Sequence, residues 1–202
     1  MKSLVQYLEE KLIIKKNKST NYNYFPETKK ELQDIILKRI KDEGNEVDLN
    51  DIDVSEITDM SSLFYAYENF NGDISDWDVS NVTDMRAMFY WCKKFNQDIS
   101  NWDVSNVTNM FGMFITCPKF NQDISKWNVS NVKDMGDMFY DCESFNQDIS
   151  DWDVSKVKNM NFMFYGCKAF NQDISSWDVS NVTDNDRIFK DCPIEEKYKP
   201  KF

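Results

Sequence analysis

The chain has 202 residues, of which 41% are hydrophobic and 15% aromatic, so it can bury a core and is too apolar to be disordered throughout. It contains no histidine, the commonest general base and metal ligand, and no apolar run reaches the roughly 18 residues that a membrane-spanning helix needs. Residues 1–47 carry 10 basic and 8 acidic groups, whereas residues 48–202 carry 14 and 27, and a body with a net charge of −13 disfavours nucleic-acid binding.

The first residues, MKSLVQYLEEKLIIKKN, place charges inside an apolar stretch and lack the small-residue cleavage site of a secretory signal. We therefore expect a cytoplasmic or virion-associated protein without signal peptide or transmembrane segment. The same stretch resembles the N-terminal capsid-targeting peptides of large tailed phages, in which a head protease cuts after a Leu/Ile-x-Glu motif; Leu8-Glu9-Glu10 would supply that motif. An ordinary amphipathic helix capped by Ser3 is the alternative.

The segment FPETKKELQDIILKRIKDEG predicts one helix in the N-terminal segment 1–47. Thr28 and Glu31 form a capping box, and Gly44 ends the helix. Its apolar stripe consists of Leu32, Ile35, Ile36 and Ile40. We expect this stripe to cap the open end of the repeats that follow, and a partner-binding helix is the alternative.

From residue 48 to residue 192 the chain repeats itself about every 25 residues, in six copies of which the first and last are degenerate. The methionine column, for example, is Met60, Met85, Met110, Met135 and Met160, with Asn185 in the sixth place. Self-similarity at a period of 20 to 50 residues predicts a solenoid, in which each unit buries its apolar face against its neighbours. Residues 193–202 are expected to form a C-terminal tail.

Local chemistry predicts the path of each coil. In DISNWDVSNV (98–107), β-prone residues separated by Asp, Ser and Asn predict one or two short strands with a bend. Asn109 stands where every other copy has Asp or Asn, and it is expected to cap a short helical turn carrying MxxMF. The residues expected to point inward in this copy are Ile99, Trp102, Val104, Val107, Met110, Met113, Phe114, Cys117 and Phe120.

The order FNQDISxWDVSNVTDMxxMFxxC resembles the BspA-type leucine-rich repeats, specifically the 25-residue class first catalogued as a mycoplasma domain of unknown function. The resemblance covers residues 48–192 and implies a leucine-rich-repeat-like right-handed solenoid with a parallel sheet on one side. With the N-terminal helical cap, the expected fold is an α/β repeat solenoid of about six coils. The resemblance also implies adhesion or protein binding and brings no catalytic residues; surface display, common in this family, conflicts with the missing secretion signal.

Three further columns are expected to be structural. The cysteines, one repeat apart from Cys92 to Cys192, lack a CxxC pair or histidine partners, and an odd number in a non-secreted chain argues against disulfides, so we expect buried thiols. Asp columns starting at Asp73 and Asp78 are expected to form turns, with a calcium ladder as the alternative. The asparagines after each Phe, beginning at Asn71, are expected to form a ladder that satisfies backbone groups. We expect no metal and no cofactor.

The positions that change between copies cluster on and after the predicted helical turn, and many of them are aromatic. Exposed aromatic side chains are typical of binding patches, although partial packing along the flank of the solenoid would also explain them. The candidate partner-binding residues are Tyr65, Arg86, Tyr90, Trp91, Phe111, Ile115, Tyr140, Phe162 and Tyr165.

No copy differs from the others in a way that marks an active site, so we expect a protein that is not an enzyme. The main hypothesis is a protein-binding scaffold that docks another protein through the variable aromatic face, with no nucleic acid or membrane partner, alone or as a component of a larger assembly. Two alternatives stay open. One is a phage virion-associated structural or packaged protein, and the other is an acidic nucleic-acid mimic that inhibits a host defence protein.

Overall fold

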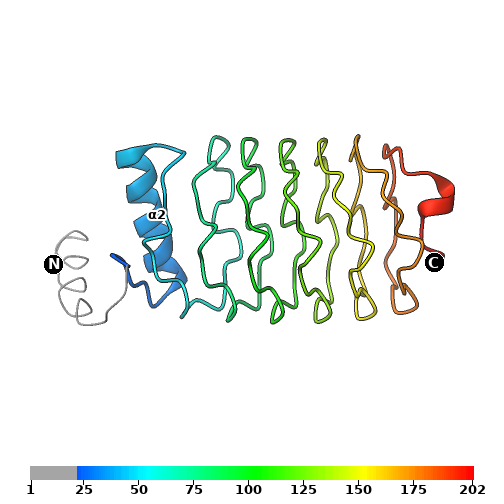
Figure 1. Ribbon diagram of the computed structural model, residues 1–202, viewed down its shortest axis with the longest axis horizontal. Helices are drawn as coiled ribbons and strands as arrows, with labels where there is room; N and C mark the ends of the chain where they lie inside the picture. The colour runs from blue at the N-terminus through cyan, green and yellow to red at the C-terminus, as the bar shows by residue number, and fades with distance from the viewer. Residues whose placement is uncertain (1–21) are drawn as a thin grey trace.

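The computed structural model describes residues 22–202, so the predicted capsid-targeting motif and the helix capped by Ser3 lie outside the described residues. These residues form an elongated stack of coils with helix α2 (Lys29–Glu43) at one end and the short 3-10 helix η1 (Glu196–Tyr198) at the other (Figure 1). Within residues 22–202 no helix has the length and apolarity to cross a bilayer.

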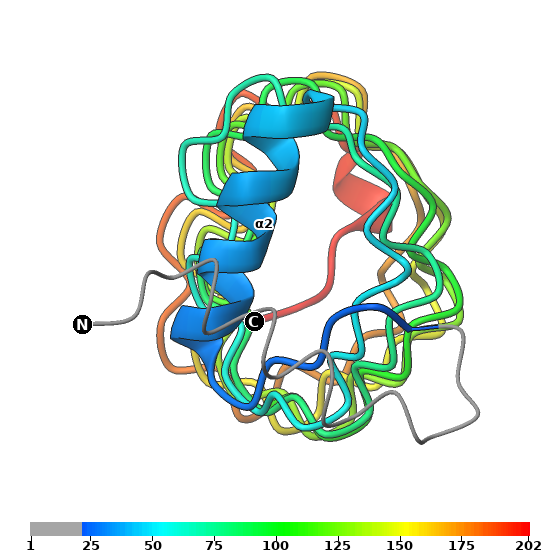
Figure 2. The ribbon, with the colours of Figure 1, turned by 90° about the vertical axis from the view of Figure 1, so that its left-hand side faces the viewer.

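Helix α2 begins and ends where the sequence predicts. The hydroxyl of Thr28 accepts a hydrogen bond from the N–H of Glu31 at 3.2 Å, and Gly44, with a φ of 97°, donates its N–H to the carbonyl of Ile40. Figure 2 shows α2 lying over the open end of the stack, at the first coil. Its apolar stripe faces the core, where the buried residues are Leu32, Ile35 and Ile36. The helix therefore covers the N-terminal end of the stack.

The predicted α/β fold, a leucine-rich-repeat-like right-handed solenoid with a parallel sheet, is wrong. Between residues 22 and 202 the structure contains α2 and η1 and no strand. Seven isolated parallel bridges are all that the described residues show of β pairing. Five of these bridges run in series through Asp59, Asp84, Asn109, Asp134, Asn159 and Asp184. The coils are mostly irregular, and they are built from tight turns instead of strands.

Turns replace the predicted strands because Asp recurs every five residues in DISNWDVSNV. The Oδ1 atom of Asp98 accepts the N–H of Ser100 at 2.9 Å, and Oδ1 of Asp103 accepts the N–H of Ser105 at 3.0 Å. Main-chain hydrogen bonds between residues three apart close both turns. The apolar residues are spaced by three, two and three positions, whereas a half-buried strand needs strict alternation. The Asp side chains, which were expected only to separate the apolar residues of a strand, therefore bend the chain.

The predicted helical turn at MxxMF is also not a helix. Two positions in this part of the coil have left-handed backbone, Gly112 with φ 62° and Thr116 with φ 54°, and such residues interrupt a right-handed helix. Alternate residues from 110 to 116 instead donate their N–H groups to carbonyls 24 residues later, at 2.7–3.0 Å. Asn109, predicted as a helix cap, accepts the N–H of Phe111 at 3.0 Å in a local turn.

Inside the coils, apolar side chains stack on their counterparts in the next coil. The ring of Phe114 lies 5.5 Å from that of Phe89 and 5.8 Å from that of Phe139, nearly parallel to both. The indole N–H of Trp102 donates to the carbonyl of Ile74, and the other four tryptophans of this column make the equivalent bond. The nine side chains predicted to point inward are all at most 3% exposed. This part of the prediction is confirmed.

Residues 193–202 cover the C-terminal end of the stack. Ile194 and Pro200 are buried, and Tyr198 packs against the core. The N–H of Ile174 donates to the carbonyl of Tyr198 at 3.0 Å, which ties this segment to the last coil. Both ends of the apolar stack are therefore covered by the chain itself.

Candidate functional site

The aromatic candidates lie along one flank of the stack, a few residues after the bridge positions. The rings of Tyr65 and Tyr90 are stacked with centroids 4.7 Å apart, and those of Tyr140 and Tyr165 are also 4.7 Å apart. Ile115 holds the place between the two pairs. We call Tyr65, Tyr90, Ile115, Tyr140 and Tyr165 the aromatic column; Lys190 holds this position in the last coil. Its spacing follows from the 25-residue step, which brings the same position of each coil into register.

Trp91 stands beside the aromatic column in an unusual conformation. Its φ is 63°, and its side chain is 43% exposed. The left-handed region costs an L residue roughly 1–2 kcal/mol, and a bulky side chain is rare there. The other coils fill the same position with small or polar residues, namely Ala66, Thr116, Asp141, Gly166 and Asp191. A large apolar side chain that is both strained and exposed suggests selection for contact with another molecule.

A hollow of about 350 Å³ opens in the middle of this flank. We call it the central hollow. Its lining residues are Tyr90, Trp91, Ile115, Thr116, Asp137 and Tyr140. Ile115, which lines it, is smaller than the tyrosines that occupy the same position in the coils on either side. Four of the six lining residues are candidates from the sequence.

Two carboxylates make the central part of this flank acidic. Burial raises the pKa of Asp137, with a smaller contribution from the charge of Asp134, and burial also raises the pKa of Asp141, with a smaller contribution from Glu143. Both side chains are half-buried, and within residues 22–202 neither forms an ion pair. Among these residues no cation offsets the charge of Asp137, whereas the charge of Lys168 partly offsets that of Asp141. A cation bound from outside would therefore stabilise Asp137 in particular.

Cations of the chain already lie over three aromatic rings of this flank. The ammonium of Lys93 is 5.5 Å from the ring centre of Trp91, and that of Lys190 is 5.5 Å from the ring centre of Tyr165. The guanidinium of Arg187 lies 5.8 Å from the ring centre of Phe162. Such distances are within the range of cation–π attraction.

The remaining candidates take different places. Phe162 tilts against Tyr140 and Tyr165, with ring centres 6.4 and 6.1 Å away, so it belongs to the same flank. Arg86 is exposed and pairs with Asp84 at 2.8 Å, and Phe111 is 36% exposed; neither lines the central hollow. Thr116 and Asp137, which do line it, were not among the candidates. Their variation between copies was the signal that could have identified them.

The other columns stabilise the stack. The amide oxygen of Asn71 accepts the N–H of Asn96 at 2.9 Å, and this ladder continues to Asn171, as predicted. The cysteines are free; four are buried and Cys192 is partly buried. Each thiol donates to a main-chain carbonyl, as Cys117 does to Phe89 at 2.9 Å. The turn aspartates accept serine N–H groups, and no cluster of three or more acidic or thiol side chains suited to a metal exists within residues 22–202.

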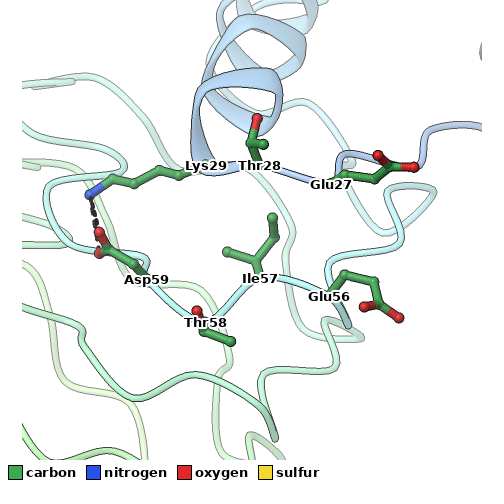
Figure 3. Close-up of a pocket in the computed structure, with 7 residues that line it drawn as sticks. All are labelled: Glu27, Thr28, Lys29, Glu56, Ile57, Thr58 and Asp59. Atoms are coloured by element: carbon green, nitrogen blue, oxygen red, sulfur yellow. Dashed lines mark hydrogen bonds and ion pairs between the residues drawn. The ribbon is translucent and has the colours of Figure 1, made fainter.

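A second hollow, of about 180 Å³, lies where helix α2 meets the first coil (Figure 3). Across it, the ammonium of Lys29 contacts Asp59 at 3.1 Å and the hydroxyl of Ser61 at 2.6 Å. Near the other end of α2, Arg39 pairs with Asp51 at 2.7 Å. These contacts fasten the capping helix to the stack, and this hollow is a seam between two parts of the fold.

A third hollow, of about 340 Å³, is lined by Lys133, Lys156, Lys158 and Asn181. Lys156 replaces an asparagine of the repeat and donates to the amide oxygen of Asn131 at 2.8 Å. Its lining is basic, in contrast to the central hollow. The flank that combines exposed rings, a strained tryptophan and the uncompensated carboxylate of Asp137 remains the best candidate for a functional site.

Comparison with known proteins bears on the repeat as a whole. Neither the curated proteins nor the solved structures gave a match to this chain. One family model matches twice, over residues 36–126 and 100–199, and the two matches together cover more than half of the chain. The chain therefore belongs to the family described as "Mycoplasma protein of unknown function, DUF285".

Proposed function

We propose that this protein is a non-enzymatic protein-binding scaffold with repeats of the BspA type, and that it docks its partner on the flank formed by the aromatic column and Trp91. The observation that carries the proposal is Trp91, which exposes a large ring from a backbone conformation that small residues adopt at lower cost. Packing of the fold does not require this residue, because the other coils are closed by small or polar residues at the same position.

The rigidity of the flank also supports a docking role. Each turn on this flank is tied to the next coil by several main-chain hydrogen bonds, such as Trp91 to Ile115 at 2.8 Å. The stacked tyrosine pairs hold one another in place, so little side-chain entropy is lost when a partner binds. Tyrosine and tryptophan are the side chains that most often contribute large shares of binding energy at protein interfaces.

The test is a triple substitution, Tyr90→Ser, Trp91→Ser and Tyr140→Ser, followed by capture of partners from the native host and quantification by mass spectrometry. We expect the variant to lose at least tenfold in affinity for the captured partner, because truncated anchor residues typically cost more than 1 kcal/mol each.

The matched control removes exposed apolar side chains elsewhere, through Leu37→Ser and Phe202→Ser, which are 54% and 52% exposed in the wild type. This control should capture the partner normally, and both variants should keep the circular dichroism spectrum of the wild type. Unchanged capture by the triple variant would show that the partner binds elsewhere.

A second candidate function rests on Leu8-Glu9-Glu10. A protein packaged into a phage head would be processed after this motif, and the mature chain would begin at Lys11. Mass spectrometry of purified particles from a producing host tests this directly. Particles that lack the protein, or that contain it with residues 1–10 attached, would remove the support for packaging through such a peptide.

A further inference from the structure

We propose that the central hollow is a receptor for an arginine side chain of the partner protein, with the guanidinium inserted between the rings of Tyr90 and Tyr140 and paired with Asp137. This inference rests on the proposed function, because it assigns a chemistry to the middle of the same flank.

The geometry of the aromatic column provides a slot for a flat group. Tyrosine rings in adjacent coils stack at 4.7 Å, with interplanar angles of 3° and 11°. Tyr90 and Tyr140 are two coils apart, which corresponds to about 10 Å at two inter-chain spacings. Ile115 replaces the ring that would fill this interval, and the interval is the central hollow. A planar group stacked between the two rings would restore the regular spacing of the column.

The charge of the slot selects a cation. Asp137 contributes a half-buried carboxylate to the lining, and within residues 22–202 it has no cationic partner. Residues 48–202 carry an excess of 13 negative charges, so a basic partner is also attracted over longer distances. Trp91 also lines the hollow, but the ammonium of Lys93 already lies 5.5 Å from the centre of its indole, so the rings left for an external cation are those of Tyr90 and Tyr140.

Arginine fits this combination better than lysine. Its guanidinium is planar, stacks on aromatic faces and can donate in parallel to one carboxylate, whereas an ammonium is compact and strongly hydrated. The same flank already contains one such pairing, because Arg187 of the chain lies over Phe162 at 5.8 Å. Lys93 of the chain already lies over Trp91 and Lys190 over Tyr165, whereas within residues 22–202 no cation lies over Tyr90 or Tyr140.

The tryptophans give a direct readout. Five of the six indoles are at most 6% exposed and donate to main-chain carbonyls, whereas Trp91 is exposed at the rim of the hollow. In a ¹H–¹⁵N correlation spectrum, a ligand in the hollow should shift the indole signal of Trp91 and leave the other five unchanged. Trp91→Phe assigns that signal.

The probes are N-acetylarginine methylamide and its neutral isostere N-acetylcitrulline methylamide, with N-acetyllysine methylamide as a third ligand. We expect the arginine probe to shift the Trp91 signal saturably, with at least fivefold weaker binding of both citrulline and lysine. Asp137→Asn should weaken arginine binding at least threefold and leave citrulline binding unchanged. Asn is well tolerated at a φ of 55°, so this variant should fold.

Asp153→Asn is the matched control, because it removes one carboxylate outside the hollow and Asn128 holds the equivalent position in a neighbouring coil. It should leave arginine binding unchanged. Equal binding of citrulline and arginine, equal binding of lysine and arginine, or no effect of Asp137→Asn would each overturn the assignment.

The outcome separates this inference from the proposed function. If the triple serine variant loses its partner while the arginine probe fails to shift the Trp91 signal, the flank docks a partner and the guanidinium slot is wrong. If the probe binds as expected and the triple variant captures its partner normally, the slot exists and the docking role of the flank is wrong.

Discussion

Left-handed residues determine the shape of the flank that carries the candidate site. Ten residues other than glycine between positions 22 and 202 have φ between 50° and 63°, whereas glycine occupies only two of the equivalent turn positions, Gly112 and Gly166. Each costs free energy that a glycine would avoid. The bulkiest hydrophobic residues among them, Trp91 and Phe162, lie on the flank where contact with a partner is proposed.

Gly166 gives a prediction at the scale of one residue. A Cβ atom added there would lie 2.0 Å from Oδ1 of Asp141, whereas a Cβ at Gly112 would meet only the flexible end of Ile115 at 2.8 Å. We expect Gly112→Ala to lower the free energy of unfolding by about 1 kcal/mol, the cost of left-handed alanine, and Gly166→Ala to lower it by clearly more. Urea denaturation measures both.

The second step removes the obstructing side chain. In an Asp141→Gly background, Gly166→Ala should cost no more than Gly112→Ala does in the wild type. If Gly166→Ala lowered the free energy of unfolding equally with and without the Asp141 side chain, this would show that the carboxylate moves aside without an energetic penalty.

At the scale of one coil, hydrogen bonds between coils override local sequence preference. The apolar positions could be predicted, because a strict 25-residue step places each one above its own copy whatever the local backbone does. The strands and the helical turn could not, because short apolar patterns are ambiguous and the deciding bonds join residues 24 to 28 positions apart. Only α2, whose caps and stripe are local, was predicted with both its ends.

The same limit applies to the candidate site. Tyr90, Trp91 and Tyr140 could be found because an aromatic residue at a variable position is conspicuous. Asp137 stands at a position that varies between copies, but it is one of 35 acidic residues, and the sequence does not show which of them the fold half-buries. Its half-burial, its raised pKa and its place in the hollow are properties of the assembled coils.

The turn aspartates predict how stability depends on pH. Hydrogen bonds from the side chain and backbone of Ser175 lower the pKa of Asp173, and those of Ser180 lower the pKa of Asp178. A carboxyl with a lowered folded-state pKa stabilises the protein above its unfolded pKa of about 3.9, and this contribution is lost as pH falls through the folded value. We expect the free energy of unfolding to fall below about pH 4.

Burial gives Asp137 and Asp141 the opposite dependence. Their raised pKa values mean that each destabilises the folded state at neutral pH and that this penalty is relieved as pH falls towards the folded-state pKa. As pH is lowered from 7 to 3, the free energy of unfolding should therefore first rise and then fall when the turn aspartates become protonated. Asp137→Asn with Asp141→Asn should abolish the rise, and a rise that persists in this variant would assign it to other groups.

At the scale of the whole molecule, each coil is stacked on the next, with α2 at one end of the stack and residues 193–202 at the other. Phe114 has a ring on each side, at 5.5 and 5.8 Å, whereas Phe189 has Phe164 on one side and the ammonium of Lys199 on the other. In such a quasi-linear array the stability is approximately a sum of units and nearest-neighbour contacts. The position of a side chain along the stack should therefore matter as much as its type.

We expect Phe114→Ala to lower the free energy of unfolding by about 3–5 kcal/mol, the usual range for a buried phenylalanine, and Phe189→Ala by less than half of that. Equilibrium denaturation followed by tryptophan fluorescence measures both changes. Equal costs at the two positions would indicate that the stack unfolds as one compact unit without regard to distance from its ends.

The hydrogen bonds that join neighbouring coils bear on how the gene can change in length. Trp102 donates to residue 74, Cys117 to residue 89 and Asn96 to residue 71, and the next coil repeats each bond with every number raised by 25. Excision or duplication of one 25-residue unit by unequal recombination would therefore leave every acceptor with an equivalent donor. Related genes should differ in length by multiples of 75 base pairs, and their products should lengthen or shorten without a new core having to evolve.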